Sequence, residues 1–416
     1  MKQTADVVII GGGIQGLSLA YHLARRGVTD VCLVEMNTLG SGSSGRSAAV
    51  IGFAFPSENC LPLVQASFAA LMRFPEELGA DPGYQPIGCL LLAGTEGAPE
   101  LRHRHALLER LGIDSQLVDR ETIAHLTPGL NLEDIEVGLY NAREGCIDPH
   151  SIMMAYSHHA RRLGVELVEG MRATGLQIEG DRVVGVCTTA GPIATPCVVN
   201  AAGFRARQVA AWAGLDLPII NRKRHIFCTG PVPAYSGSIP FTYEVELPWY
   251  MRREGPGLLI GMGAVESDEQ DPQVDWSFLD TVVEHSLHRA PLLEQAGIKS
   301  GWAGLRPITP DDDPILGPTR HLHGFFNDCG WGGHGIMHAP AGGLLVADWI
   351  IDGEPTTFNS SYFWSGAVCP RQVMSRCPLP RHGQCTDGQQ MEQKLAACRV
   401  REWAFLLHPA TEAATK

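Results

Sequence analysis

The feature that most constrains the fold is a glycine-rich loop between an apolar strand and an amphipathic helix near the start of the chain. Residues 6–10 (DVVII) read as a buried parallel strand, and GGGIQG at 11–16 follows at once. Apolar residues at helical spacing continue to about Gly27, and a second apolar strand at 31–34 leads into Glu35. This order is typical of a dinucleotide-binding unit, in which glycines admit a pyrophosphate to a helix N-terminus and an acid accepts from a ribose hydroxyl. The loop does not distinguish NAD from FAD, and a tight turn without a ligand is the alternative.

A second glycine pattern, CGWGGHGIMHAP at 329–340, matches the same loop motif. FFN at 325–327 can form a strand before it, and residues 340–351 read as a helix after it. A dinucleotide unit also needs a second apolar strand with a terminal acid, and DGEPTTFNSS at 352–361 offers none. We therefore expect a glycine turn that opens a helix and faces an electron-rich group, such as a flavin ring, whose reduced form is negative near N1. His334 would then lie close to the ring, and a buried histidine satisfied by backbone is the alternative.

Other segments suit a nucleotide-binding sheet and a second sheet. GSGSSGRS at 40–47 offers hydroxyls and backbone N–H groups to phosphate, although by composition it could be a flexible linker. CVVNAAG at 197–203 is an apolar strand running into small residues, or a plain buried strand and turn. Residues 223–263 change to alternating strands, with Tyr250 and Arg252 on one face. A mixed or antiparallel sheet, separate from the nucleotide sheet, is expected there.

Arg306 lies in GWAGLRPITPDDDPILG at 301–317, a stretch otherwise apolar and fixed by glycine and proline. A buried arginine needs a partner, and its planar fork suits a carboxylate. That carboxylate belongs either to a ligand or to residues 311–313 in a structural ion pair, and the residues alone leave both open.

Composition argues against several classes of function. The net charge of −13 argues against nucleic acid, which needs a basic face, and against docking on anionic lipid. No apolar run approaches the roughly 18 residues that span a bilayer, so no transmembrane segment is expected. The first strand is reached by Asp6, which leaves no room for a signal or transit peptide, and a cytoplasmic protein is expected. The 12 cysteines include no C-x-x-C pair, so we expect reduced thiols and no metal site.

Taken in order, these motifs resemble the FAD-dependent D-amino-acid oxidase superfamily, and most closely its branch of sarcosine oxidase β subunits and related amine dehydrogenases. GLRP at 304–307, TPD at 309–311, PILG at 314–317 and GHGIMHAP at 333–340 also carry the resemblance, which spans about residues 5–365. It implies an α/β (α+β) fold, with a glutathione-reductase-type FAD-binding Rossmann domain interleaved with a mixed-sheet substrate domain.

The resemblance also implies an activity. A small amino acid or N-methylated amine, such as sarcosine, dimethylglycine, proline or glycine, would pass a hydride to flavin N5, and the imine would be hydrolysed. Oxygen or another carrier would reoxidise the flavin, and the resemblance leaves open a partner subunit. Two other functions compete with this one. They are a non-catalytic FAD-binding assembly or interaction protein on the same fold, and a nicotinamide dehydrogenase, which the missing second nucleotide unit disfavours.

Site residues follow from the resemblance position by position. Arg306 matches the position that binds the substrate carboxylate in glycine and D-amino-acid oxidases, and Tyr250, Arg252 and His334 are further candidates near the substrate. The residues expected along FAD are Gly11, Gly13, Ile14, Gln15, Gly16, Glu35, Met36, Ser43, Ser44, Arg46, Ser47, Ala173, Ala201, Ala202, Gly203, Gly332, Gly333, His334, Gly335, Ile336 and Met337.

Two positions depart from the monomeric sarcosine oxidases, which otherwise resemble this chain. Gly304 stands where those enzymes attach the flavin to a cysteine, so non-covalent FAD is expected. Met337 stands where they have a lysine that serves carboxylate binding and oxygen activation, which leaves the electron acceptor open.

The expected domains are interleaved along the chain. The FAD-binding domain is expected to comprise residues 1–80, 145–215 and 302–366, and the substrate domain residues 81–144 and 216–301. The tail, 367–416, is expected to be a poorly ordered extension.

Overall fold

The structure is a computed structural model and describes residues 2–267 and 272–355. Within these ranges a six-stranded sheet has the order β18-β19-β12-β1-β2-β8. Neighbours from β19 to β8 run parallel, and β18 pairs antiparallel with β19 at the edge. The strands are β1 (Val7–Ile10), β2 (Val31–Val34), β8 (Glu166–Val168), β12 (Val198–Asn200), β18 (Ile315–Pro318) and β19 (Phe325–Cys329). The parallel sheet predicted from the N-terminal motif is thus confirmed.

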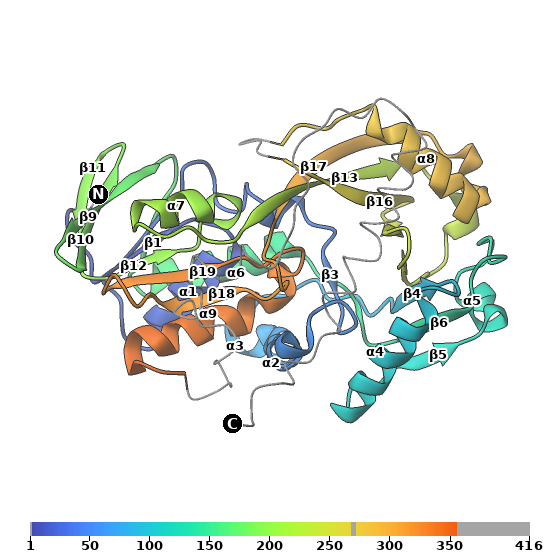
Figure 1. The fold of residues 1–416 in the computed structure, drawn as a ribbon, viewed down its shortest axis with the longest axis horizontal. Coiled ribbons are helices and arrows are strands. Elements are labelled where there is room, and N and C mark those ends of the chain that lie inside the picture. The colour runs from blue at the N-terminus through green and yellow to red at the C-terminus, as the bar shows by residue number, and fades with distance from the viewer. Residues whose placement is uncertain (1, 268–271, 356–416) are drawn as a thin grey trace, which may run out of the picture. The chain divides into compact units, whose positions relative to one another are not determined.

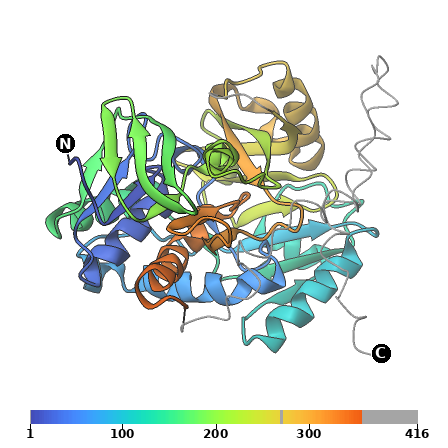
Figure 2. The same ribbon diagram turned by 60° about the vertical axis from the view of Figure 1, so that its left-hand side comes forward.

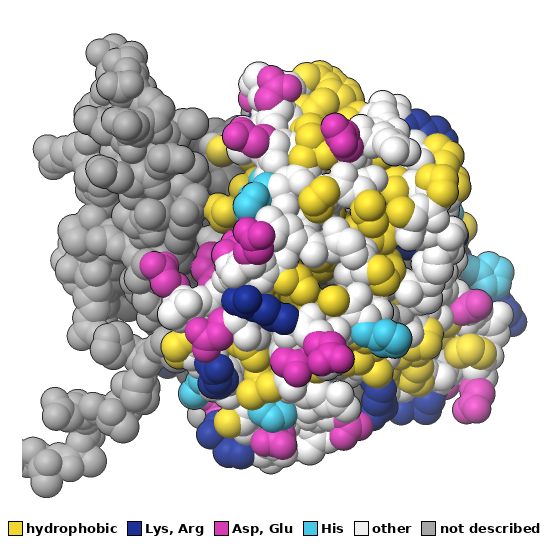
Figure 3. Space-filling model, turned by 90° about the vertical axis from the view of Figure 1, so that its right-hand side faces the viewer, with side chains coloured by type: hydrophobic (Ala, Val, Ile, Leu, Met, Phe, Trp, Pro, Cys, Tyr) yellow, Lys and Arg dark blue, Asp and Glu magenta, His cyan; other side chains and the backbone are white. Residues whose placement is uncertain are grey.

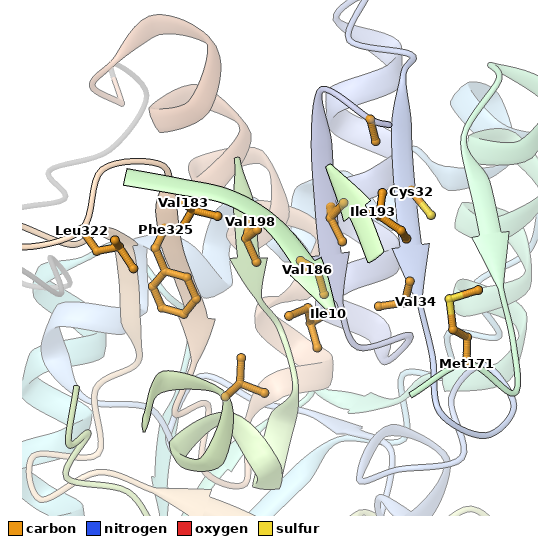
Figure 4. Close-up of a cluster of buried hydrophobic side chains, with 13 residues drawn as sticks. Ile10, Cys32, Val34, Met171, Val183, Val186, Ile193, Val198, Leu322 and Phe325 are labelled. Carbon is orange, nitrogen blue, oxygen red and sulfur yellow. The ribbon is translucent and has the colours of Figure 1, made fainter. Parts of the chain in front are cut away.

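Both faces of this sheet are covered, which explains why β1 and β2 are apolar and fully buried. Val8 and Ile10 contribute to a core shared with a three-stranded antiparallel sheet (Figure 4). Ile9 points to the other face, where α1 contacts both α6 and α9 (Figure 1). These elements are β9 (Ala173–Glu179), β10 (Arg182–Thr188), β11 (Gly191–Ala194), α1 (Ile14–Arg25), α6 (Pro149–Arg162) and α9 (Gly335–Asp352).

A second large sheet has eight strands in the order β17-β13-β16-β15-β14-β4-β6-β5. Among the described residues, only β14 and β4 run parallel within this sheet, so the sheet is mixed. The strands are β4 (Cys89–Ala93), β5 (Gln116–Val118), β6 (Val137–Asn141), β13 (Ile220–Thr229), β14 (Phe241–Glu244), β15 (Trp249–Glu254), β16 (Gly257–Glu266) and β17 (Ile298–Ile308). The expectation of a separate mixed sheet is confirmed.

The two faces of the eight-stranded sheet differ. Phe227, Met251 and Ile260 pack with Val282 of α8 (Phe278–Arg289) in one core. Figure 2 shows this helix, in dark gold, beside strands of the sheet. The alternate residues of the same strands, including Ile226 and Tyr250, lie on the opposite face. That opposite face supplies the side chains of the candidate site.

The remaining helices surround the two sheets. They are α2 (Leu61–Met72), α3 (Phe74–Leu78), α4 (Ala98–Arg110), α5 (Arg120–Leu126) and α7 (Ala206–Trp212), and β3 (Val50–Ile51) pairs with β7 (Gly145–Cys146). β17 begins at Ile298 and ends at Ile308 within the eight-stranded sheet, so this strand crosses the predicted domain boundary at residue 302. The domain bounds stay a prediction, and the predicted extension at 367–416 lies outside the described residues.

Helix α9 begins at Gly335, earlier than the predicted start at Pro340, so that prediction was wrong. A proline inside a helix lacks a donor and disturbs the preceding turn, which made Pro340 a natural boundary in the sequence. Ser67 of α2 compensates for this disturbance. Its hydroxyl donates to the carbonyl of His338 and accepts from the N–H of Ala341, both at 3.1 Å.

The surface and composition add few constraints on function. Figure 3 shows acidic and basic side chains interspersed on one face of the molecule. In the described ranges, no helix has both the length and the hydropathy to cross a membrane. The same ranges contain no group of three or more His, Cys, Asp or Glu side chains placed to hold a metal ion.

Candidate cofactor and substrate site

The first glycine loop leaves the sheet where the strand order reverses, between β1 and β12. Gly11 has φ +118°, and a Cβ there would collide with the carbonyl of Ala201 at the end of β12. A Cβ at Gly16 would likewise collide with the carbonyl of Gly11. The two glycines therefore allow the loop, β12 and α1 to approach closely. α1 has no side-chain cap, which leaves its N-terminus able to face an anion at this edge.

Glu35 follows β2 at the same edge and is held from both sides. Its Oε2 accepts from the N–H of Gly12 and its Oε1 from the N–H of Asn37, both at 2.8 Å. Each oxygen keeps a second lone pair for a ribose hydroxyl. The carbonyl of Glu35 accepts from Met171 N at 2.9 Å, which brings the strand that starts at Ala173 beside the acid.

The loop at 40–47 joins the first glycine loop to the second sheet. Ser44 Oγ accepts from Ile14 N at 3.1 Å, at the start of α1. Ser43 Oγ donates to the carbonyl of Leu305 in β17 at 2.6 Å. Arg46 lies beside β17 as well, because a Cβ at Gly304 would be 3.2 Å from its Cβ. The interpretation of this segment as a flexible linker is not supported by these contacts.

The second glycine turn, residues 330–334, lies on the same sheet edge as the first loop. β19 precedes the turn and pairs with β12, which in turn pairs with β1. Gln15 joins the two loops directly, since its Nε2 donates to the carbonyl of Gly335 at 2.9 Å. The turn therefore lies beside the first glycine loop and opens a helix, as expected from the sequence.

Arg306 reaches the second glycine turn from β17. A Cβ at Gly333 would lie 2.6 Å from Nη1 of Arg306, and Gly332 N donates to the carbonyl of Pro307 at 2.9 Å. Burial, together with the nearby positive charge of Arg224, lowers the pKa of Arg306 to about 10. In the part of the chain that the structure describes, the Arg306 guanidinium forms no hydrogen bond or ion pair.

The aspartates at 311–313 have other contacts. Asp313 accepts from Ser57 and, at 2.8 Å, from Asn59. Asp312 approaches His334 at 3.9 Å. The structural Arg306–aspartate ion pair that the sequence left open is thus not formed within residues 2–267 and 272–355.

Tyr250 and Arg224 lie on the same face of the eight-stranded sheet as Arg306. Tyr250 is buried, its hydroxyl has no partner among the described residues, and its electrostatic neighbours include both arginines. Arg224 is 9% exposed, and its Nε and Nη1 are buried without a partner in the same ranges. Arg224 was not predicted. The sequence signal was the run of three consecutive cations, residues 222–224, within one strand.

Arg252 differs from Arg224 and Arg306 because its Nε and Nη1 groups already donate hydrogen bonds within the protein. Its Nε donates to the carbonyl of Ala48 at 2.8 Å and its Nη1 to the carbonyl of Arg253 at 2.9 Å. It also forms an ion pair with Glu254. These contacts hold the segment that follows the 40–47 loop and leave Arg252 the weaker candidate for substrate contact.

His334 lies in the second turn as a neutral side chain. Burial, and then the neighbouring His338 and Arg306, hold the pKa of His334 well below its usual range. His338 Nδ1 donates to the carbonyl of His334 at 2.8 Å, and burial lowers the pKa of His338 to about 4. Both imidazoles are therefore uncharged near neutral pH.

The structure brings most of the other predicted residues to the same edge. Gly13 caps α1, and Met36 follows Glu35. Ala202 and Gly203 follow β12, and Ile336 and Met337 are buried in the first turn of α9. Ser47 accepts from Ala49 N at 3.0 Å, within the segment that leads into β3.

Comparison with known proteins agrees with this geometry. The sequence profile of the family described as FAD dependent oxidoreductase matches residues 6–349. Dimethylglycine dehydrogenase, mitochondrial, of Rattus norvegicus is 34% identical over 377 residues, which cover 85% of this chain and 44% of the rat protein. Sarcosine oxidase subunit beta of Rhizobium meliloti is 27% identical over 364 residues, covering 85% of this chain and 86% of the relative.

Among solved structures, L-proline dehydrogenase from P. horikoshii superposes with a TM-score of 0.81 at 28% identity, covering 88% of this chain and 98% of that one. The fold is therefore that of known flavoenzymes. The chain spans less than half of the rat relative's length. Because the family profile covers most of the sequence, this chain belongs to the FAD-dependent oxidoreductase family.

Proposed function

We propose that this chain oxidises a small amino acid or N-methylated amine at the carbon next to nitrogen, with FAD as the acceptor. The observation that carries the proposal is Arg306, whose guanidinium forms no hydrogen bond or ion pair within the described residues and lies against the second glycine turn. A substrate carboxylate would supply the missing counter-charge through two parallel hydrogen bonds. The relatives are named for dimethylglycine, sarcosine and proline, which supports a substrate whose nitrogen carries a carbon substituent.

The residues at the sheet edge fit FAD. Glu35 is positioned to accept from the ribose, and the start of α1 with Ser44 would meet the pyrophosphate. The turn at 332–337 would hold the ring. Gly304 offers no side chain for a covalent bond, so we propose non-covalent FAD. When bound, FAD supplies the acceptor for a hydride from the substrate carbon, and water hydrolyses the resulting imine.

The protein side chains would bind and orient the substrate. Arg306 would fix the carboxylate, and the unpartnered hydroxyl of Tyr250 would donate to the same group. The neutral His334 would add no competing positive charge beside the ring. Met337 offers no cation for oxygen, so another electron carrier is the acceptor we favour over oxygen. One relative is by name a subunit, and a partner subunit is part of this proposal.

Anaerobic reduction of the FAD-loaded protein tests the proposal. Sarcosine, dimethylglycine, proline, glycine and D-amino acids are added in turn, and we expect at least one to bleach the flavin absorbance. If none does while FAD remains bound, the chain is a non-catalytic FAD-binding protein and the proposed activity is wrong.

Arg306→Ala tests the residue on which the proposal rests. Loss of the carboxylate contact should cost about 2–5 kcal/mol, which is roughly a 30-fold or larger fall in kcat/KM through a raised KM. Arg207→Ala, which removes an exposed arginine paired with Asp216, is the matched control and should leave KM unchanged. An unchanged KM in Arg306→Ala would exclude Arg306 from substrate binding.

A further inference from the structure

We infer that the substrate carries two carboxylates, one bound by Arg306 and the other by Arg224. The inference rests on the proposed function and narrows its substrate class to N-substituted amino acids with a second acidic group. N-methylaspartate is the simplest probe of this class.

The register of two strands brings the arginines together. β13 and β17 are antiparallel, with Arg224 opposite Gly304 and Arg222 opposite Arg306. Arg224 and Arg306 are therefore diagonal neighbours on one face, about 7–8 Å apart. Gly304 has no side chain to separate them.

The charge balance of this pair is unusual for a protein interior. Arg224 is 9% exposed with two buried nitrogens unpaired, and Arg306 has no hydrogen bond or ion pair within the described ranges. An unpaired buried cation is costly, and Arg224 lies close enough to Arg306 to disfavour the charge of Arg306.

A substrate with one carboxylate would leave part of this charge unbalanced. One carboxylate carries a single negative charge, so it balances one guanidinium and leaves the charge of the second arginine without a matched anion. Two carboxylates neutralise both arginines and give each a planar partner. His334 is held neutral in part by the same two arginines, so it adds no third charge.

Arg224 has one competing role, which is to stabilise the negative charge of the reduced flavin. That role would act on every substrate alike, because it concerns the cofactor. Recognition of a second carboxylate instead acts only on substrates that have one, and matched substrates therefore separate the two roles.

The kinetic test compares N-methylaspartate with N-methylalanine, which lacks only the second carboxylate. In the FAD-loaded protein we expect kcat/KM for flavin reduction to favour N-methylaspartate by about a hundredfold. Arg224→Met should remove this preference by lowering only the N-methylaspartate value, whereas Arg306→Met should lower both. Lys223→Met removes the next cation along β13, on the other face, and should keep the preference.

Ligand binding, measured without turnover, tests the same inference independently of the kinetics. Calorimetry of the FAD-loaded protein should show succinate binding more tightly than butyrate, and Arg224→Met should abolish the difference. Equal binding of the two acids, or an equal loss of both activities in Arg224→Met, would overturn the inference. If no amine reduces the flavin, the proposed function fails separately, and the succinate titration still decides whether the two arginines bind a dicarboxylate.

Discussion

At the scale of single residues, Glu144 is a buried acid outside the candidate site. It is 1% exposed, its Oε1 accepts from Phe53 N at 2.9 Å, and its Oε2 is buried without a partner in the described ranges. Burial raises the pKa of Glu144 from 4.5 to about 7. The folded protein therefore keeps a proton on Glu144 over a pH range in which the unfolded chain releases it.

Glu144→Gln tests this residue through the pH dependence of stability. Between pH 4.5 and about 7 the folded state binds more protons at this site, so its contribution to the free energy of unfolding falls as pH rises. The fall is about 1.4 kcal/mol per pH unit and levels off above the folded pKa. Glutamine does not titrate, so the variant lacks this loss. When the free energy of unfolding in urea is measured from pH 5 to 8, the variant should gain stability relative to the parent protein as the pH rises. If the free energies of unfolding of the two proteins changed in parallel with pH, the raised pKa of Glu144 would be refuted.

Prediction from sequence succeeded for structure that is local in the chain and failed where the structure depends on distant strands. The loop at 11–16 and Glu35 were found because strand, turn, helix and acid follow one another in the chain. Arg306 was found through the family motif. Arg224 was missed because its lack of a partner depends on the register of β13 against β17, which is set by the whole sheet.

At the scale of elements, α9 shows how a distant contact overrides a local rule. Pro340 should break the helix, yet α9 runs from Gly335 to Asp352 because Ser67 supplies hydrogen bonds at the break. Ser67 lies 271 residues from His338 in the chain, so no local pattern reveals the contact.

Ser67→Ala should destabilise the protein by about 1–3 kcal/mol, because it leaves the His338 carbonyl and the Ala341 N–H buried without a partner. The measurement is the free energy of unfolding in urea. Gln65→Ala on the same helix is the control and should change the free energy of unfolding by less than about 0.5 kcal/mol. Equal effects of the two substitutions would mean that Ser67 is not needed for the irregular start of α9.

At the scale of the whole molecule, the candidate site connects segments far apart in the sequence. α1 packs on α9, and Ser18 Oγ donates to the carbonyl of Ala339 at 2.7 Å. His22 Nε2 makes a similar contact with the carbonyl of Pro340 at 3.0 Å. A ligand that bridges both glycine loops would therefore hold the two ends of the described region together.

FAD should accordingly raise the thermal unfolding midpoint in a concentration-dependent way. Binding only to the folded state adds about 2.7 kcal/mol at a free FAD concentration a hundred times its Kd. Riboflavin lacks the adenylate half that the loop with Glu35 would hold, so it should raise the midpoint much less. An equal shift with both compounds would mean that the first glycine loop contributes nothing to cofactor binding.

The strand order of the sheet that carries both glycine loops also determines when during synthesis the two loops can come together. β1 is made early, β12 near the middle and β19 late, yet the three are adjacent. A nascent chain that has passed β2 contains the first glycine loop and Glu35 but not the second glycine turn. If both loops hold FAD as proposed, capture of the intact cofactor would wait until α9 has left the ribosome.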